Sequence, residues 1–170
     1  PARLMYHGRT RHGGQSLVKE KSDSPLTYYP PSSGLALTLK YFHSKPEIIN
    51  LNVGVLGLGV GEVASLGRPG DLFHFYEINP AVLRIANQHF SYLKNSRADI
   101  SVTLGDGRVS LERQIKEGLD SQFDVLLTDA FSSDSVPTHL LTIEAFKVYF
   151  QSLKPKGILV VHISNKFMKL

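Results

Sequence analysis

Glycines and carboxylates stand at the ends of four apolar runs, and they are the residues of this 170-residue chain best placed to do chemistry. They are Gly57-x-Gly59-x-Gly61, Glu77, Gly105-Asp106-Gly107 and Asp129. Glycine lets the backbone turn tightly and approach a ligand closely, and a carboxylate accepts hydrogen bonds from hydroxyl and amine groups. The pattern therefore indicates a site for a ligand that carries such groups.

Glu77 lies about 20 residues after Gly57, an offset at which an acid accepts hydrogen bonds from ribose hydroxyls. The alternative for Glu77 is an acid that is favoured by the dipole of the following helix. Asp106 could accept from an exocyclic amine, or it could be a turn residue or the N-cap of the next helix. The glycine loop and Glu77 together favour a nucleoside.

Asp129 is expected to project into the same cleft, where a lone carboxylate is costly unless it serves a ligand or is well paired. Asp134 could contact a substrate or cap its loop. His162, at the end of a fifth apolar run, could contact an acceptor or be a hydrogen-bonded histidine at a strand end. A dinucleotide dehydrogenase fits poorly, because the loop reads G-x-G-x-G and lacks the later glycine of G-x-G-x-x-G.

Apolar runs alternate with helical patterns through most of the chain. Strands are predicted over 51–57, 72–77, 100–104, 123–128 and 157–163, and helices over 34–42, 80–90, 108–117 and 142–153. Strands that are apolar throughout and alternate with helices predict an α/β fold with a doubly wound, mostly parallel sheet covered on both faces. Ligands bind such sheets beyond the carboxyl ends of the strands, where the chemical residues above lie.

The N-terminal segment has a different pattern. Two short apolar runs, 4–7 and 15–18, predict a small β-hairpin. We expect residues 1–33 to form this hairpin with a connecting loop, and 34–170 to form a Rossmann-like nucleoside-binding domain whose last strands are missing from the sequence. An open edge at the fifth strand would leave backbone groups free to pair with another chain. A homodimer through that edge or the hairpin is therefore an alternative to a monomer.

Composition narrows the class of protein. The net charge of +4 is mild, and the densest basic cluster (Arg3, Arg9, Arg11 and His12) is expected to be solvated or to line a small-molecule pocket, so no nucleic-acid partner is expected. The chain has no cysteine and no histidine pair at metal-ligand spacing, so neither a disulfide nor a metal is expected. It has no apolar run long enough for a bilayer and no visible signal peptide, which predicts a cytoplasmic location with no membrane span in this segment.

The ordered motifs resemble the spermidine synthase (polyamine aminopropyltransferase) family over roughly residues 4–165. Gly13-Gly14-Gln15 looks like that family's hairpin. The stretch from His7 to Gly13 and the closing His162-Ile163-Ser164-Asn165 are closer to a spermidine-synthase-like branch that is often fused to membrane segments. The resemblance implies the class I S-adenosylmethionine methyltransferase fold. It also implies S-adenosylmethionine, or its decarboxylated form, as co-substrate without a metal.

The resemblance also implies roles for single residues. The residues that would hold the nucleoside are Gln15, Glu77, Ile78, Asp106 and Gly107. Those that would surround the sulfonium tail are Gly57, Gly59 and Gly61, and those that would contact the acceptor are Tyr29, Asp134 and His162. Asp129 matches the catalytic aspartate, which would take a proton from the attacking amine.

Two positions and the C-terminal region depart from the family. Val60 stands where the family's glycine loop has an aspartate, and Tyr28-Tyr29-Pro30-Pro31-Ser32 stands where the family has Tyr-His-Glu. Because a polyamine needs several carboxylates for specific binding, three hypotheses stay open. They are aminopropyl transfer to a small amine, methyl transfer to an unknown acceptor, and nucleoside binding without turnover.

Overall fold

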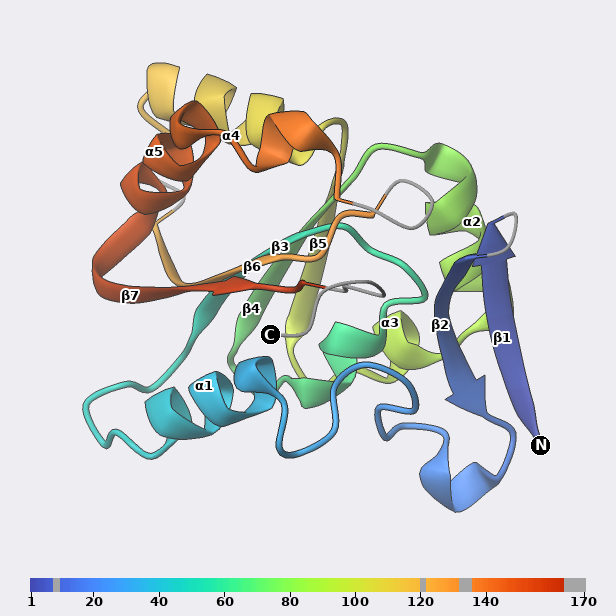
Figure 1. Cartoon of the computed structure of the whole chain (residues 1–170). Coiled ribbons are helices and arrows are strands. Elements are labelled where there is room, and N and C mark those ends of the chain that lie inside the picture. The colour runs from blue at the N-terminus through green and yellow to red at the C-terminus, as the bar shows by residue number, and fades with distance from the viewer. Residues whose placement is uncertain (8–9, 120–121, 132–135, 164–170) are drawn as a thin grey trace, which may run out of the picture.

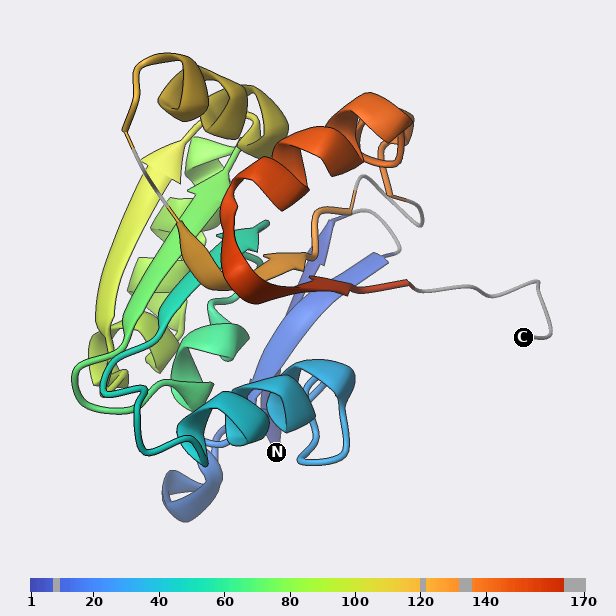
Figure 2. The ribbon, with the colours of Figure 1, turned by 90° about the vertical axis from the view of Figure 1, so that its left-hand side faces the viewer.

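A five-stranded parallel sheet forms the centre of the molecule in the computed structural model, which describes residues 1–7, 10–119, 122–131 and 136–163 (Figure 1). Its strands are β3 (Asn52–Leu56), β4 (Leu72–Glu77), β5 (Asp99–Leu104), β6 (Phe123–Thr128) and β7 (Leu153–Val161). The spatial order is β5-β4-β3-β6-β7, and Figure 2 shows β5 and β7 at opposite edges. The chain thus builds outward from β3 in one direction and then in the other, as the doubly wound prediction requires.

Helices cover both faces of this sheet. They are α1 (Gly34–His43), α2 (Pro80–His89), α3 (Tyr92–Asn95), α4 (Gly107–Lys116) and α5 (Ile143–Gln151), with short 3-10 turns η1 (Lys19–Lys21), η2 (Glu62–Leu66) and η3 (Thr138–Leu140). In Figure 1, α4 and α5 lie on one side of the sheet and α1 on the other. Val53, Val55 and Phe75 face the α1 side, whereas Leu126 and Tyr76 face α4 and α5. This alternation explains why the central strands are apolar throughout.

The helices begin where the sequence supplies a cap. The side chains of Ser33, Asn79, Asp106 and Thr142 each accept a hydrogen bond from a backbone N–H in the first turn of α1, α2, α4 and α5. Pro80 occupies the first helical position of α2, where its missing N–H costs nothing. None of the helices in the described ranges is long and apolar enough to cross a membrane.

A separate two-stranded antiparallel sheet lies beside α2, formed by β1 (Ala2–His7) and β2 (Thr10–Ser16) (Figure 1). The hairpin prediction is confirmed, but its second strand was placed too late, at 15–18. A register shift between Met5 and Tyr6 lets the polar residues Thr10 and Arg11 pair across the hairpin with His7 and Tyr6, and strand periodicity gives no signal for such pairing. Met5 packs with Val60, Phe90 and Tyr92, and this contact fixes the hairpin against the glycine loop.

The two edge strands also differ from the sequence expectation. Helix α5 ends at Gln151 and β7 begins at Leu153, whereas the predicted strand began at 157. Lys156 has a positive φ of 69°, and the register with β6 shifts there, so a turn-like stretch is accommodated inside the strand as an irregularity. Strand β5 has no fully buried residue, but its Ile100 and Val102 pack against the core, so the sheet is less completely covered at this edge than at its centre.

Candidate functional site

The predicted chemical residues lie along one edge of the sheet, at the carboxyl ends of the strands. Backbone hydrogen bonds continue one residue past the strand ends and join the segments: Gly57 N to Tyr76 O, Gly105 N to Glu77 O, Asp129 N to Leu56 O, and His162 N to Thr128 O. These bonds are 2.8 to 3.0 Å long. The glycine loop and Asp129 therefore flank the point at which the strand order reverses, where α/β sheets bind ligands.

Asp129 has two titratable partners. Its Oδ1 lies 2.5 Å from Nδ1 of His162, and its Oδ2 accepts a hydrogen bond from the hydroxyl of Tyr29. The side chains of Asp129 and His162 are 21% and 22% exposed, whereas Tyr29 is buried. The carboxylate is thus well paired and still reachable from solvent.

These contacts shift the pKa of both partners. The hydrogen bond to Asp129, and then its negative charge, raise the pKa of His162 above 6.5, although partial burial works against the shift. Burial, followed by the charge of and hydrogen bond to Asp129, raises the pKa of Tyr29 well above 10. Tyr29 therefore remains a hydrogen-bond donor at neutral pH, and His162 keeps its proton to a higher pH than an ordinary imidazole does.

Aromatic rings surround His162. The ring centroids of Tyr28, Tyr29 and Phe131 lie 5.5, 6.0 and 5.2 Å from that of His162. The guanidinium carbon of Arg11 lies 5.6 Å from the centroid of Tyr28, a distance at which a cation is attracted to the ring. The imidazole is therefore fixed by packing as well as by its hydrogen bond.

Glu77, in contrast, is occupied by backbone groups. It is buried, and its two carboxylate oxygens accept hydrogen bonds from the N–H groups of Leu58, at 3.0 Å, and Asn79, at 2.8 Å. One side chain thus joins the glycine loop to the start of α2. The neighbouring Ile78 is 69% exposed, so an apolar surface lies beside this carboxylate.

The glycine loop is tightly packed by the rest of the fold. Gly57 has a φ of 102°, and a Cβ on it would lie 2.5 Å from the carbonyl oxygen of Asp129. Gly59 has a φ of 55°, and a Cβ there would lie 2.8 Å from the carbonyl oxygen of His12 in the hairpin. Gly61 also has a positive φ, of 81°. Close backbone packing at Gly57 and Gly59, and the positive φ at all three positions, therefore favour glycine whether or not a ligand is bound.

Asp106 is the N-cap of α4, which is one of the alternatives that the sequence left open. Its Oδ1 accepts from Val109 N as the N-cap of α4, and its Oδ2 lies 2.8 Å from Nε2 of His139. The side chain remains 21% exposed. A Cβ on Gly107 would lie 2.8 Å from the side chain of Leu56, so this segment packs directly on the end of β3.

Gln15 is buried and makes internal hydrogen bonds. Its Nε2 donates to Ser22 O at 2.8 Å and to Ser91 Oγ at 2.6 Å, and its Oε1 accepts from Ser91 N at 3.1 Å. These contacts join β2 to the segment between α2 and α3. Asp134, predicted to contact the acceptor, lies outside the described residues.

Glu62, which follows the glycine loop, is a functional residue that the sequence analysis missed. It is buried and accepts hydrogen bonds from the N–H and hydroxyl of Thr27 and from the N–H of Tyr28. Glu62 therefore holds the loop that brings Tyr29 to Asp129. An acid beside a glycine loop was the available signal, but nothing local indicated that its partner lies 34 to 35 residues away.

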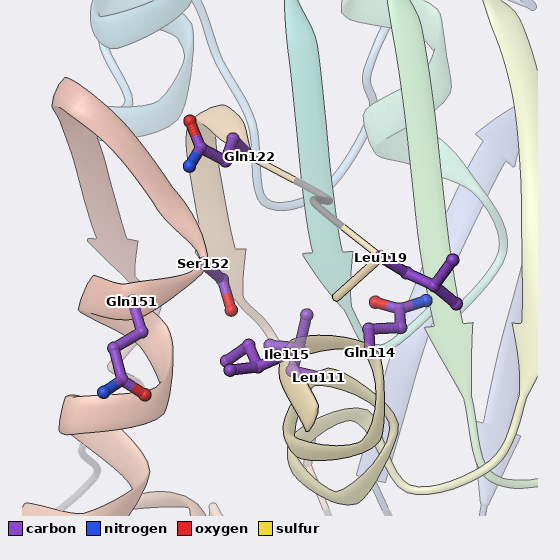
Figure 3. Close-up of a pocket in the computed structure, with 7 residues that line it drawn as sticks. All are labelled: Leu111, Gln114, Ile115, Leu119, Gln122, Gln151 and Ser152. Atoms are coloured by element: carbon purple, nitrogen blue, oxygen red, sulfur yellow. The ribbon is translucent and has the colours of Figure 1, made fainter. Parts of the chain in front are cut away.

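Two hollows in the described surface lie away from these residues. The one in Figure 3 has a volume of about 70 Å³ and is lined by the C-terminal part of α4 and by Gln151 and Ser152 at the end of α5. The second, of about 320 Å³, is lined by residues that include Asn52, His74 and Asp99. Neither contains a predicted site residue. Within the described ranges, no group of three or more His, Cys, Asp or Glu side chains could hold a metal ion.

The chain is similar in sequence to a transferase. No protein-family model matches the chain. A polyamine aminopropyltransferase of Vibrio vulnificus (strain CMCP6) is 33% identical over 137 residues, which are 79% of this chain and 43% of that protein. The chain thus spans less than half the length of this relative.

Two solved structures show the same architecture. Human methyltransferase-like protein 13 in complex with SAH has a TM-score of 0.60 and 22% identity, over 72% of this chain and 60% of that one. Spermidine synthase from Thermotoga maritima has a TM-score of 0.57 and 18% identity, over 76% of this chain and 42% of that one. With its parallel sheet and N-terminal hairpin, the chain has a spermidine-synthase-like form of the S-adenosylmethionine-dependent methyltransferase fold.

Proposed function

We propose that this chain is a transferase domain that binds an adenosine sulfonium co-substrate and moves its aminopropyl group to a small amine. The observation that carries the proposal is the position of Asp129. It lies at the reversal point of the sheet, partly exposed, with His162 on one carboxylate oxygen and Tyr29 on the other. A carboxylate held by two titratable partners is typical of an acid–base centre.

The nucleoside would lie along the ends of β4 and β5. Each oxygen of Glu77 accepts one N–H, and an ionised carboxylate has about four lone-pair sites. Glu77 therefore keeps acceptors for ribose hydroxyls. Ile78 would pack against the adenine, and Asp106 and Gly107 would meet its polar edge. Gln15 would contribute its remaining acceptor position from the hairpin side.

The reaction needs a neutral amine and a stabilised cation. An alkylammonium has a pKa of roughly 10 and cannot attack until it loses a proton. The negative charge of Asp129, with His162 against it, would favour both the cationic reaction centre and removal of that proton. The sulfonium tail would lie on the loop formed by Gly57, Gly59 and Gly61. Such proton transfer contributes on the order of 10²–10⁴ in rate.

The position of Val60 argues for an acceptor with a low positive charge. Its side chain is buried against the hairpin and packs with Met5, Phe90 and Tyr92, so the glycine loop supplies no carboxylate there. Among the described site residues, Tyr29, His162 and Asp129 are then left to contact the acceptor. A monoamine or short diamine fits this set better than a tri-cation, which requires several carboxylates.

Methyl transfer from S-adenosylmethionine is the second candidate. The loss of an acid at Val60 favours it, because one carboxylate fewer relieves repulsion of the carboxylate on the co-substrate itself. The fold shared with human methyltransferase-like protein 13, which was solved with SAH, also supports it.

Thermal-shift titration distinguishes these functions. S-adenosylmethionine, its decarboxylated form and methylthioadenosine are added separately, since a ligand stabilises the folded state by RT ln(1 + [L]/Kd). Aminopropyl transfer predicts stronger stabilisation by the decarboxylated compound and an alkylated product from an amine mixture. Preference for the carboxylated compound, with methylated product, supports the second candidate. Stabilisation without any product indicates nucleoside binding alone, and the absence of stabilisation by all three refutes the proposal.

A further inference from the structure

The hydrogen bond between Asp129 and His162 raises the question of which of the two side chains receives the proton of the amine. The carboxylate oxygens of Asp129 are both engaged, Oδ2 by the hydroxyl of Tyr29 and Oδ1 by Nδ1 of His162. An ionised carboxylate can only accept hydrogen bonds, so Nδ1 of His162 carries the proton between the two groups. The lone pair of the neutral imidazole is then on Nε2, across the ring from Asp129.

We propose that Nε2 of His162 is the base that takes the proton from the attacking amine, and that Asp129 orients the imidazole and stabilises the imidazolium. This inference rests on the proposed transferase function. The amine lone pair forms the new N–C bond, and the C–S bond breaks with its electron pair on sulfur. Because that electron pair stays on sulfur, the sulfonium becomes a neutral thioether. The proton lost by the amine nitrogen goes to Nε2 and then to water.

The surroundings of His162 suit this role. The backbone N–H of His162 donates to Thr128 O at 3.0 Å, which fixes the residue at the end of β7. The groups that face the ring are Asp129, from the segment after β6, and Tyr28 and Tyr29, from the loop before α1. Phe131 adds an uncharged ring, and the Arg11 cation lies over Tyr28. Asp129 is thus the one anionic group in direct contact among the described neighbours.

General-base chemistry favours imidazole over carboxylate at neutral pH. A base works best when its pKa is near the operating pH, and ordinary imidazole and aspartate have pKa values of about 6.5 and 3.9. The hydrogen bond to Asp129 raises the pKa of His162 further and makes Nε2 more basic. A histidine that is oriented and stabilised by an aspartate is also the arrangement by which hydrolases activate their nucleophiles.

The decisive variant is His162→Gln, assayed with decarboxylated S-adenosylmethionine and the best amine acceptor. Glutamine keeps a polar side chain near Asp129 but cannot take up a proton. We expect kcat to fall about 10²–10⁴-fold, with an unchanged thermal shift on adding methylthioadenosine. His89→Gln, on the exposed end of α2, is the matched control and should keep wild-type kcat.

A second readout follows the proton directly. NMR titration of the His162 ring should give a pKa above 6.5 in the wild type, and kcat should fall as the pH drops below that same value, because the protonated ring cannot accept. In Asp129→Asn the pKa of His162 should return towards 6.5. The Nδ1–H tautomer should dominate in the neutral wild-type ring.

The outcomes separate this inference from the proposed function. Product formation with His162→Gln within a few-fold of wild-type kcat, or an acidic limb that does not follow the His162 titration, would overturn the inference and return the proton to Asp129. If the wild type binds nucleoside but alkylates no amine, the proposed function fails and the base assignment is refuted with it. Loss of kcat in His162→Gln with nucleoside binding intact supports both.

Discussion

Glu77 and Asp129 are both acids at the carboxyl edge of one sheet, but their surroundings differ completely. Glu77 is buried, and backbone N–H groups of Leu58 and Asn79 occupy its oxygens. Asp129 is partly exposed and is held by the titratable side chains of Tyr29 and His162. On the β4 side the acid is thus held by backbone groups, and on the β6–β7 side it is held by titratable groups, where we propose that a proton moves.

This difference shows that a carboxylate at a strand end does not by itself indicate catalysis. Backbone N–H donors fix a carboxylate but do not change their own protonation state near neutral pH. A histidine and a tyrosine leave the same group in a network whose protonation changes. The partners of the acid, more than its place in the fold, decide between scaffolding and chemistry.

The largest expected effect is that of Asp129→Asn. The amide cannot stabilise an imidazolium, so we expect kcat to fall about 10²–10⁴-fold, while the thermal shift with methylthioadenosine changes little. Steady-state product assays and thermal-shift titration measure the two quantities. Retention of wild-type kcat would show that Asp129 has no catalytic role and would contradict the proposed difference between Asp129 and Glu77.

Glu77→Gln should lower stability and nucleoside binding, which Asp129→Asn should leave largely unchanged. A glutamine offers one oxygen where two backbone N–H groups need acceptors, so the free energy of unfolding should fall by about 1–3 kcal/mol and the nucleoside-induced thermal shift should disappear. Urea unfolding with and without methylthioadenosine checks this. Glu112→Gln, which alters a surface ion pair with Arg108, is the control and should change stability by less than about 1 kcal/mol.

Tyr29→Phe tests the hydroxyl on the far side of Asp129 with the ring retained. Loss of one hydrogen bond worth about 0.5–1.5 kcal/mol should lower kcat by up to about tenfold. Tyr28→Phe is matched to it, because the hydroxyl of Tyr28 donates to the carbonyl of Arg11 and not to Asp129. Equal losses in the two variants would mean that the Tyr29 hydroxyl has no special part in the site.

The smallest effect is on stability against pH. The pKa of His162 is raised in the folded state, so the protonated ring contributes stability that is fully present below its unfolded pKa of about 6.5 and is lost as the pH rises through its folded pKa. Thermal unfolding of wild type and His162→Gln across that range should show this difference in slope. Parallel curves would contradict the raised pKa.

Much of the fold could be predicted because its signals are local. Strands β4 and β6 have the predicted bounds, and Pro80 begins α2 where expected. Predictions were wrong where a non-local feature took over. Strand β2 begins earlier than predicted because of the register of the hairpin. Strand β7 also begins earlier, because the irregularity at Lys156 lies within the strand.

The sequence alone determined that acids and glycines would lie at the carboxyl edge of a parallel sheet, because hydrophobic periodicity and caps act over a few residues. The tertiary structure decided which acid gained titratable partners. Tyr29 and Asp129 are 100 residues apart, and Asp129 and His162 are 33 apart. Such contacts depend on strand order and on the loop held by Glu62, and no spacing along the chain encodes them.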